Sequence, residues 1–87
     1  MKIKDGFCLR EMGGYFIVVP VGERNLSFHK MITLNETGAF LWKQLEQETT
    51  IEALVDALTT EYAVDAETAL SDIEELTAAM AKAELLA

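Results

Sequence analysis

The sequence is poor in the residues on which metal sites, disulfides and export depend. It has one cysteine and one histidine in 87 residues, so a disulfide within the chain and a zinc site built from cysteine pairs are both excluded. No apolar run approaches the ~20 residues that a membrane helix needs, and the first residues lack the apolar stretch of a secretory signal. Since a lone cysteine also suits a reducing compartment, we expect a cytoplasmic protein that binds no metal or other cofactor.

Candidate catalytic groups are also scarce. Cys8 has no activating neighbour in the sequence, and His29 cannot form a base–nucleophile pair with any obvious partner. The glycine patterns of phosphate-binding loops are absent, and the acidic run 65–75 lacks the central glycine of a calcium-binding EF-hand. The sequence therefore predicts a protein that is not an enzyme.

Basic residues are few, and they are unevenly placed. Residues 1–34 carry five Lys or Arg against three acids, whereas residues 35–87 carry two against twelve, within a net charge of −8. A strongly acidic half repels the phosphate backbone of nucleic acids. We therefore expect a protein that binds neither nucleic acid nor a membrane surface.

The first third of the sequence has the pattern of β-strands. Residues 7–12 and 15–19 are rich in apolar and β-branched residues, and Gly13-Gly14 separates them. Because glycine adopts positive φ at little cost, this pair predicts a tight hairpin. A third run, residues 26–34, alternates apolar and polar residues with one gap at Lys30, which predicts a third strand.

At Leu34 the apolar period changes from that of a strand to that of a helix. Asn35 is a good N-cap, and the positions after it repeat at helical spacing. Gly38 is unusual inside a first turn, because glycine costs a helix about 1 kcal/mol relative to alanine. We therefore expect another element to pack closely against Gly38.

Two further helices are predicted downstream. Residues 49–52 match the S/T-x-x-E capping box, and a short break at residues 63–64 precedes Asp65, a second good cap. The third helix has an apolar stripe, and the final leucines are expected to pack back onto the domain. The stripe of the third helix consists of Ala66, Ala69, Leu70, Ile73, Leu76, Thr77 and Met80.

These elements predict an α+β fold in one domain, residues 1–87. It is a small, winged-helix-like domain in which a three-stranded antiparallel sheet is followed by three helices. Such a sheet leaves an edge strand, whose unpaired N–H and C=O groups can accept an extended peptide as an additional strand.

Three stretches of the sequence stand out together: MITLNETGAFLW (31–42), TTIEALVDALTTEYAVDAETALSDIEEL (49–76) and AELL (83–86). They resemble the PqqD-like family, which is named after a protein of pyrroloquinoline quinone biosynthesis. Proteins of this kind include the RiPP recognition elements, winged-helix-like modules without catalytic activity. The resemblance implies that the chain binds the leader of a ribosomally made precursor peptide and presents it to a modifying enzyme, often a radical-SAM protein.

The resemblance also implies where the peptide binds. The leader is expected to lie as an added strand along the third strand, wedged against the third helix. Similar sequences often have glycine where this one has Glu84, so the last helix is expected to run on or to end differently. The implied peptide-binding residues are Leu26, Ser27, Phe28, His29, Lys30, Met31, Ile32, Thr33, Ile73, Leu76, Thr77 and Met80.

Two other interpretations stay open from the sequence alone. One is a winged-helix regulator of transcription, although its recognition helix would carry six acids against Lys82. The other is a purely structural subunit. The same strand edge could also pair with a second copy of the chain, which would give a homodimer.

Overall fold

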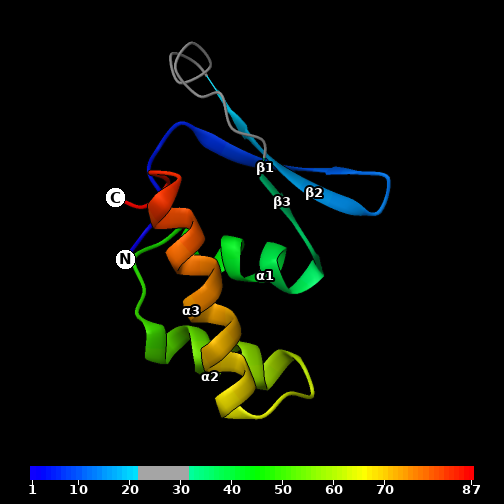
Figure 1. Cartoon of the computed structure of the whole chain (residues 1–87), viewed down its shortest axis with the longest axis vertical. Coiled ribbons are helices and arrows are strands. Elements are labelled where there is room, and N and C mark those ends of the chain that lie inside the picture. Colours follow the sequence, from blue (N-terminus) through cyan, green and yellow to red (C-terminus); the bar gives the residue numbers. More distant parts are fainter. Residues whose placement is uncertain (22–31) are drawn as a thin grey trace.

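The computed structural model describes residues 1–21 and 32–87. A sheet lies at one end of the molecule and α2 at the other, while α3 crosses α2 and continues toward the two chain termini (Figure 1). This arrangement confirms the predicted α+β class. None of the helices described is both long and apolar enough to span a membrane. The elements are β1 (Phe7–Met12), β2 (Tyr15–Pro20), β3 (Ile32–Leu34), α1 (Glu36–Leu45), α2 (Ile51–Glu61) and α3 (Ala66–Lys82).

The sheet is antiparallel, with the strand order β1-β2-β3. Met12 pairs with Tyr15 across a two-residue turn, in which Gly13 and Gly14 have φ values of 57° and 90°. Both glycines thus adopt the positive φ that a tight hairpin requires, as the sequence predicts. Of the third predicted strand, Ile32–Leu34 forms β3, and residues 26–31 lie outside the described part of the chain.

The helix caps confirm two predictions and correct a third. The Asn35 side chain accepts a hydrogen bond from the Gly38 N–H at 2.8 Å, as predicted for α1. At α2 the predicted cap, Thr49, is wrong: Thr50 is the N-cap and accepts from the Ala53 N–H at 3.1 Å. The Thr49 backbone is instead bonded to Met1 in both directions, so the helix begins one residue later.

The start of α3 is capped as predicted. The Asp65 carboxylate accepts a hydrogen bond from the Thr68 N–H at 2.7 Å. This bond, reinforced by the Thr68 side chain, lowers the pKa of Asp65 below its ordinary value of 3.8. A charged cap at the positive end of the helix dipole stabilises α3.

The helices and the sheet share one hydrophobic core. Trp42 and Leu45 of α1 meet α2, α3 and the chain ends there. The apolar stripe of α3 is narrower than predicted, because Leu70 is 38% exposed and lies at the margin of the face that packs inward. Seven large apolar side chains with at most 1% exposure fill the centre: Trp42, Leu45, Leu54, Leu58, Ile73, Met80 and Leu85.

The two ends of the chain are joined through their backbones, in an arrangement that we call the terminal seam (residues 1–4 with 85–87). Ile3 forms an antiparallel bridge with Leu86. The Lys4 N–H donates to the Leu85 carbonyl at 2.8 Å, and the Ile3 N–H donates to the Leu45 carbonyl at 2.9 Å. The seam therefore ties the end of α3 to the end of α1.

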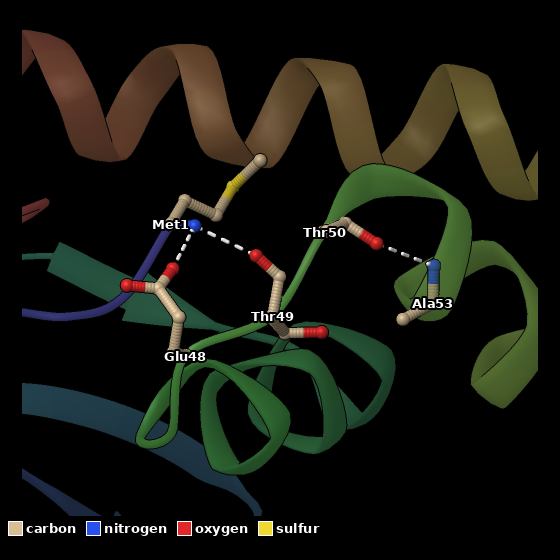
Figure 2. A network of polar contacts seen from close by, with 5 residues as sticks. All are labelled: Met1, Glu48, Thr49, Thr50 and Ala53. Carbon is tan, nitrogen blue, oxygen red and sulfur yellow. Dashed lines mark hydrogen bonds and ion pairs between the residues drawn. The ribbon is translucent and has the colours of Figure 1, made fainter.

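An ion pair lies beside this seam. The Met1 ammonium group contacts the Glu48 carboxylate and the Thr49 carbonyl, while the adjoining Thr50 caps α2 (Figure 2). The ammonium group lowers the pKa of Glu48 below its ordinary value. Because Glu48 is exposed, this pair is screened by solvent and contributes little to stability.

The position of Glu84 explains how α3 ends. The Leu85 N–H donates to the Met80 carbonyl at 2.9 Å and the Glu84 N–H to the Ala81 carbonyl at 3.0 Å, which is the Schellman pattern. Glu84 has a φ of 62°, the left-handed conformation that glycine usually supplies at this place. The helix therefore ends at Lys82, and Glu84 adopts the strained conformation itself.

Candidate functional site

A groove of about 710 Å³ lies between β3 and the C-terminal half of α3, with the first half of α1 at its base. Three separate parts of the sequence meet there. The strand supplies one wall and the helix supplies the other. The lining residues are Ile32, Thr33, Leu34, Asn35, Thr37, Gly38, Leu41, Asp72, Glu75, Leu76, Ala79, Met80, Lys82 and Ala83.

The floor of this groove is apolar and its rim is polar. Leu34, Leu41 and Met80 are buried beneath it, at 8%, 2% and 1% exposure. Ile32 and Leu76 are half-buried and pack against the core from the two walls. Apolar surface that is left partly exposed inside a concave site is the usual setting for a bound ligand.

One wall of the groove is an edge strand. β3 pairs with β2 on one side, from Val18 opposite Ile32 to Phe16 opposite Leu34. In the part of the chain that the structure describes, no strand pairs with its other side. Backbone N–H and C=O groups on such an edge can bond to an added strand.

Gly38 sets how closely α1 approaches the end of β3. A Cβ atom at this position would lie 3.1 Å from the Leu34 Cβ and 3.2 Å from the Asn35 Oδ1. These distances are tight, which confirms the predicted close packing against Gly38. The strand can therefore turn into the helix at once, so that the groove has a continuous base.

The structure brings four of the predicted site residues together. Ile32 and Thr33 line the groove from β3, and Leu76 and Met80 line it from α3. The other predicted residues of the strand, Leu26, Ser27, Phe28, His29, Lys30 and Met31, lie outside the described residues.

Two predicted residues of α3 lie elsewhere. Ile73 is 0% exposed and belongs to the core. Thr77 is half-buried, and its hydroxyl donates to the Ile73 carbonyl at 2.8 Å within the same helix. Neither lines the groove, so both positions are better explained by packing and by local hydrogen bonding than by contact with a ligand.

Several groove residues were missed because they lie beside the apolar stripe rather than in it. Asp72, Glu75 and Ala79 recur at helical spacing and are exposed, which places them on one face of α3. Lys82 and Ala83 continue that face. The helical spacing of these residues could have indicated a binding face. Without knowing that β3 lies opposite, however, such a face cannot be distinguished from one that is simply exposed to solvent.

The groove offers contact surface rather than reactive groups. Among residues 1–21 and 32–87, no three His, Cys, Asp or Glu side chains are grouped as a metal site would require. Cys8 is half-buried on β1, opposite Val19. Partial burial and the nearby Glu36 raise the pKa of Tyr62, yet Tyr62 is not a groove residue. The arrangement therefore suits binding of an extended, partly apolar ligand.

Comparisons with known proteins agree with this geometry. A model of the family described as coenzyme PQQ synthesis protein D (PqqD) matches residues 14–86. A solved structure described as "TbiB1 in Complex with the TbiA(beta) Leader Peptide" is 28% identical, with a TM-score of 0.75. The similarity covers 99% of this chain and 94% of that one. No curated protein matches the sequence.

Proposed function

The chain belongs to the PqqD family, and we propose that it is a RiPP recognition element, a non-catalytic adaptor that binds the leader of a ribosomally made precursor peptide. The observation that carries this proposal is the groove of about 710 Å³ beside the outer edge of β3, with which no described strand pairs. A similar chain, 28% identical, has been solved together with a leader peptide. A leader peptide is also the ligand that the sequence resemblance implies for this chain, and this agreement supports leader binding here.

In this proposal the leader adds to the sheet as a fourth strand. Its backbone bonds to the outer edge of β3, while alternate side chains point toward Leu41, Leu76 and Met80 between the two walls. Main-chain bonds would supply affinity for any extended segment, and the apolar floor would select its side chains. Because the described walls are joined by a rigid core, we expect little movement of the backbone on binding.

The remaining parts of the proposal concern partners and place. The adaptor would present the leader to a modifying enzyme, such as a radical-SAM protein, in the cytoplasm. The whole chain, residues 1–87, would act as one domain. Pairing of two chains through β3 would compete with the leader for the same strand edge. A homodimer of this kind would therefore form only in the absence of the leader.

A winged-helix regulator is the alternative, and charge argues against it. The exposed face of α3 carries Asp72, Glu74 and Glu75, which repel the phosphates that a recognition helix must approach. A regulator should bind duplex DNA with steep salt dependence. The adaptor should show no such binding at any salt concentration.

The test uses two neighbouring alanines. Ala78 and Ala79 are both exposed on α3, but only Ala79 lines the groove. Ala79→Trp should fill the groove and weaken leader binding by about 100-fold or more, since an indole ring occupies the space of the added strand. Ala78→Trp should leave the affinity unchanged.

The probes are synthetic peptides that cover the N-terminal halves of short reading frames encoded beside the gene for this chain. Affinity is measured by calorimetry, and the amides of Ile32, Thr33 and Leu34 are followed by NMR. The proposal fails if no such peptide binds, or if a peptide binds both variants equally well. It also fails if binding leaves the β3 amide signals unmoved.

A further inference from the structure

Among the residues that the structure describes, the groove has an acidic rim on its α3 wall. Asp72 and Glu75 are exposed and line the groove from α3. They lie one turn apart, and about 4.5 Å separates them along the helix axis at 1.5 Å per residue. Across the groove, the described residues of β3 are Ile32, Thr33 and Leu34, none of which is charged.

These two carboxylates have no partner within the described part of the protein. No hydrogen bond or ion pair involves either side chain among residues 1–21 and 32–87. The nearest cation in the groove lining is Lys82. It lies about 10 Å beyond Glu75 along the helix axis, at 1.5 Å per residue.

An extended occupant would therefore meet the two carboxylates over only part of its length. A strand rises about 3.3 Å per residue, so the stretch from Glu75 to Lys82 corresponds to about three residues of the occupant. A basic side chain is favoured beside Asp72 and Glu75. The same side chain about three residues away lies beyond both carboxylates and gains no such attraction.

We propose that the peptide segment bound in this groove carries a lysine or arginine opposite Asp72 and Glu75, next to the apolar side chains that fill the floor. This inference rests on the proposed function and adds the class of peptide that the site selects. Apolar contacts with Ile32 and Leu76, the half-buried residues of the two walls, supply most of the affinity. The acidic rim sets the register, because sliding the peptide by a few residues moves its basic side chain away from both carboxylates.

The size of the effect follows from the exposure of the rim. An exposed ion pair contributes a factor of roughly two to five in affinity. Reversing both acids replaces two attractions by two repulsions, so Asp72→Lys/Glu75→Lys should weaken binding of a matched peptide about tenfold or more at low salt. Salt should reduce this difference, because exposed charges are screened.

A matched control separates the rim from the total charge. Glu61→Lys/Glu74→Lys changes two exposed acids that do not line the groove. Both double variants alter the net charge by the same amount, so unspecific attraction of basic peptides weakens equally in the two. Circular dichroism and thermal unfolding of each variant establish that it is folded before binding is measured.

The probe is a random 12-residue peptide library displayed on phage, selected on the full chain and on both double variants. We expect the full chain and the Glu61→Lys/Glu74→Lys variant to enrich peptides with a basic residue at constant spacing from apolar residues. The Asp72→Lys/Glu75→Lys variant should enrich peptides without it. Synthetic copies of the best peptide, with and without Lys→Glu at that position, then give the change in affinity.

The outcomes distinguish this inference from the function on which it rests. If enriched peptides lose binding to Ala79→Trp but share no basic position, the acidic rim does not select and only this inference is overturned. The same holds if both double variants bind the best peptide equally. If the enriched peptides still bind Ala79→Trp, or if no peptide is enriched, the groove is not a peptide site and the proposed function falls as well.

Discussion

The terminal seam and the β3 edge differ in what completes their backbone hydrogen bonds. At the seam, Ile3 pairs with Leu86, and Lys4 bonds to the Leu85 carbonyl. At the β3 edge, no described residue of the chain pairs with the outer side of Ile32–Leu34. Both segments border α3, yet only at the seam do the described residues of the chain complete the backbone hydrogen bonds.

The difference shows how a small protein can hold a helix firmly beside a strand whose outer side pairs with no other described strand. The seam and the Schellman turn at Glu84 hold the end of α3 in place, and the apolar core holds its middle through Ile73 and Met80. The groove wall therefore does not depend on a ligand for its position. A preorganised site loses less conformational entropy when it binds.

The largest expected effect comes from truncating one leucine at the terminal seam and one in the groove. Leu85 is 0% exposed at the seam, and Leu76 is half-buried in the groove. Leu85→Ala should lower the free energy of unfolding by about 2–5 kcal/mol, because it leaves a cavity in the core. Leu76→Ala should lower it by only about 1 kcal/mol, while weakening peptide binding.

Urea denaturation and calorimetry with the best-binding peptide measure the two effects. The folded fraction of Leu85→Ala should bind with the affinity of the unchanged chain. If Leu85→Ala weakens peptide binding as much as Leu76→Ala does, the distinction between a seam that stabilises the fold and a groove that binds the peptide is wrong.

A smaller gain in stability is expected at Glu84. Glycine adopts positive φ without the penalty that a side chain brings, so Glu84→Gly should raise the free energy of unfolding by about 1 kcal/mol. The same substitution at Glu74, an exposed position inside α3, should lower it by about 1 kcal/mol. The midpoints of urea denaturation give both signs.

Peptide affinity should be the same in the Glu84→Gly variant, because Glu84 does not line the groove. A loss of stability in Glu84→Gly would mean that the Schellman turn does not hold the end of α3. The comparison between the terminal seam, which holds the end of α3, and the β3 edge would then no longer hold.

The smallest expected effect depends on pH and concerns the other end of α3. Asp65 has a pKa lowered below 3.8 by its bonds with Thr68, so its charged form stabilises the fold above that value. This contribution is lost as the pH falls through the lowered pKa of the folded protein. An asparagine at this position caps through an uncharged oxygen and does not titrate.

The stability difference between the unchanged chain and Asp65→Asn should therefore be larger at about pH 7 than at about pH 3. Comparing the two chains at each pH cancels the titration of the other carboxylates. A difference that is the same at both values would show that the charge of Asp65 adds nothing to its role as a cap.

Local sequence signals predicted most of the fold. A two-residue hairpin turn requires positive φ, which glycine adopts at little cost, so the hairpin between β1 and β2 was readable from Gly13-Gly14. Asn35 and Asp65 were likewise readable as caps from local sequence, since each side chain accepts a hydrogen bond from the N–H three residues ahead. The cap of α2 was misplaced by one residue because Met1, distant in the sequence, binds the Thr49 backbone.

The site was predictable only in outline. The resemblance pointed to the third strand and the third helix, and Ile32, Thr33, Leu76 and Met80 do meet in one groove. Periodicity could not separate Ile73, which packs in the core, from Leu76, which faces the groove. Both are apolar and lie in the same stripe, so their spacing does not show which one packs in the core and which one faces the groove.

The sequence by itself determined the elements, their order and the caps that start α1 and α3, because these depend on side chains and backbone within a few residues. Only the tertiary structure decided which face of α3 meets β3, and hence that Asp72 and Glu75 border a groove. It also decided that the chain ends close a seam at Ile3 and Leu86. Contacts between residues far apart in the chain depend on how the helices pack, and no local pattern encodes that.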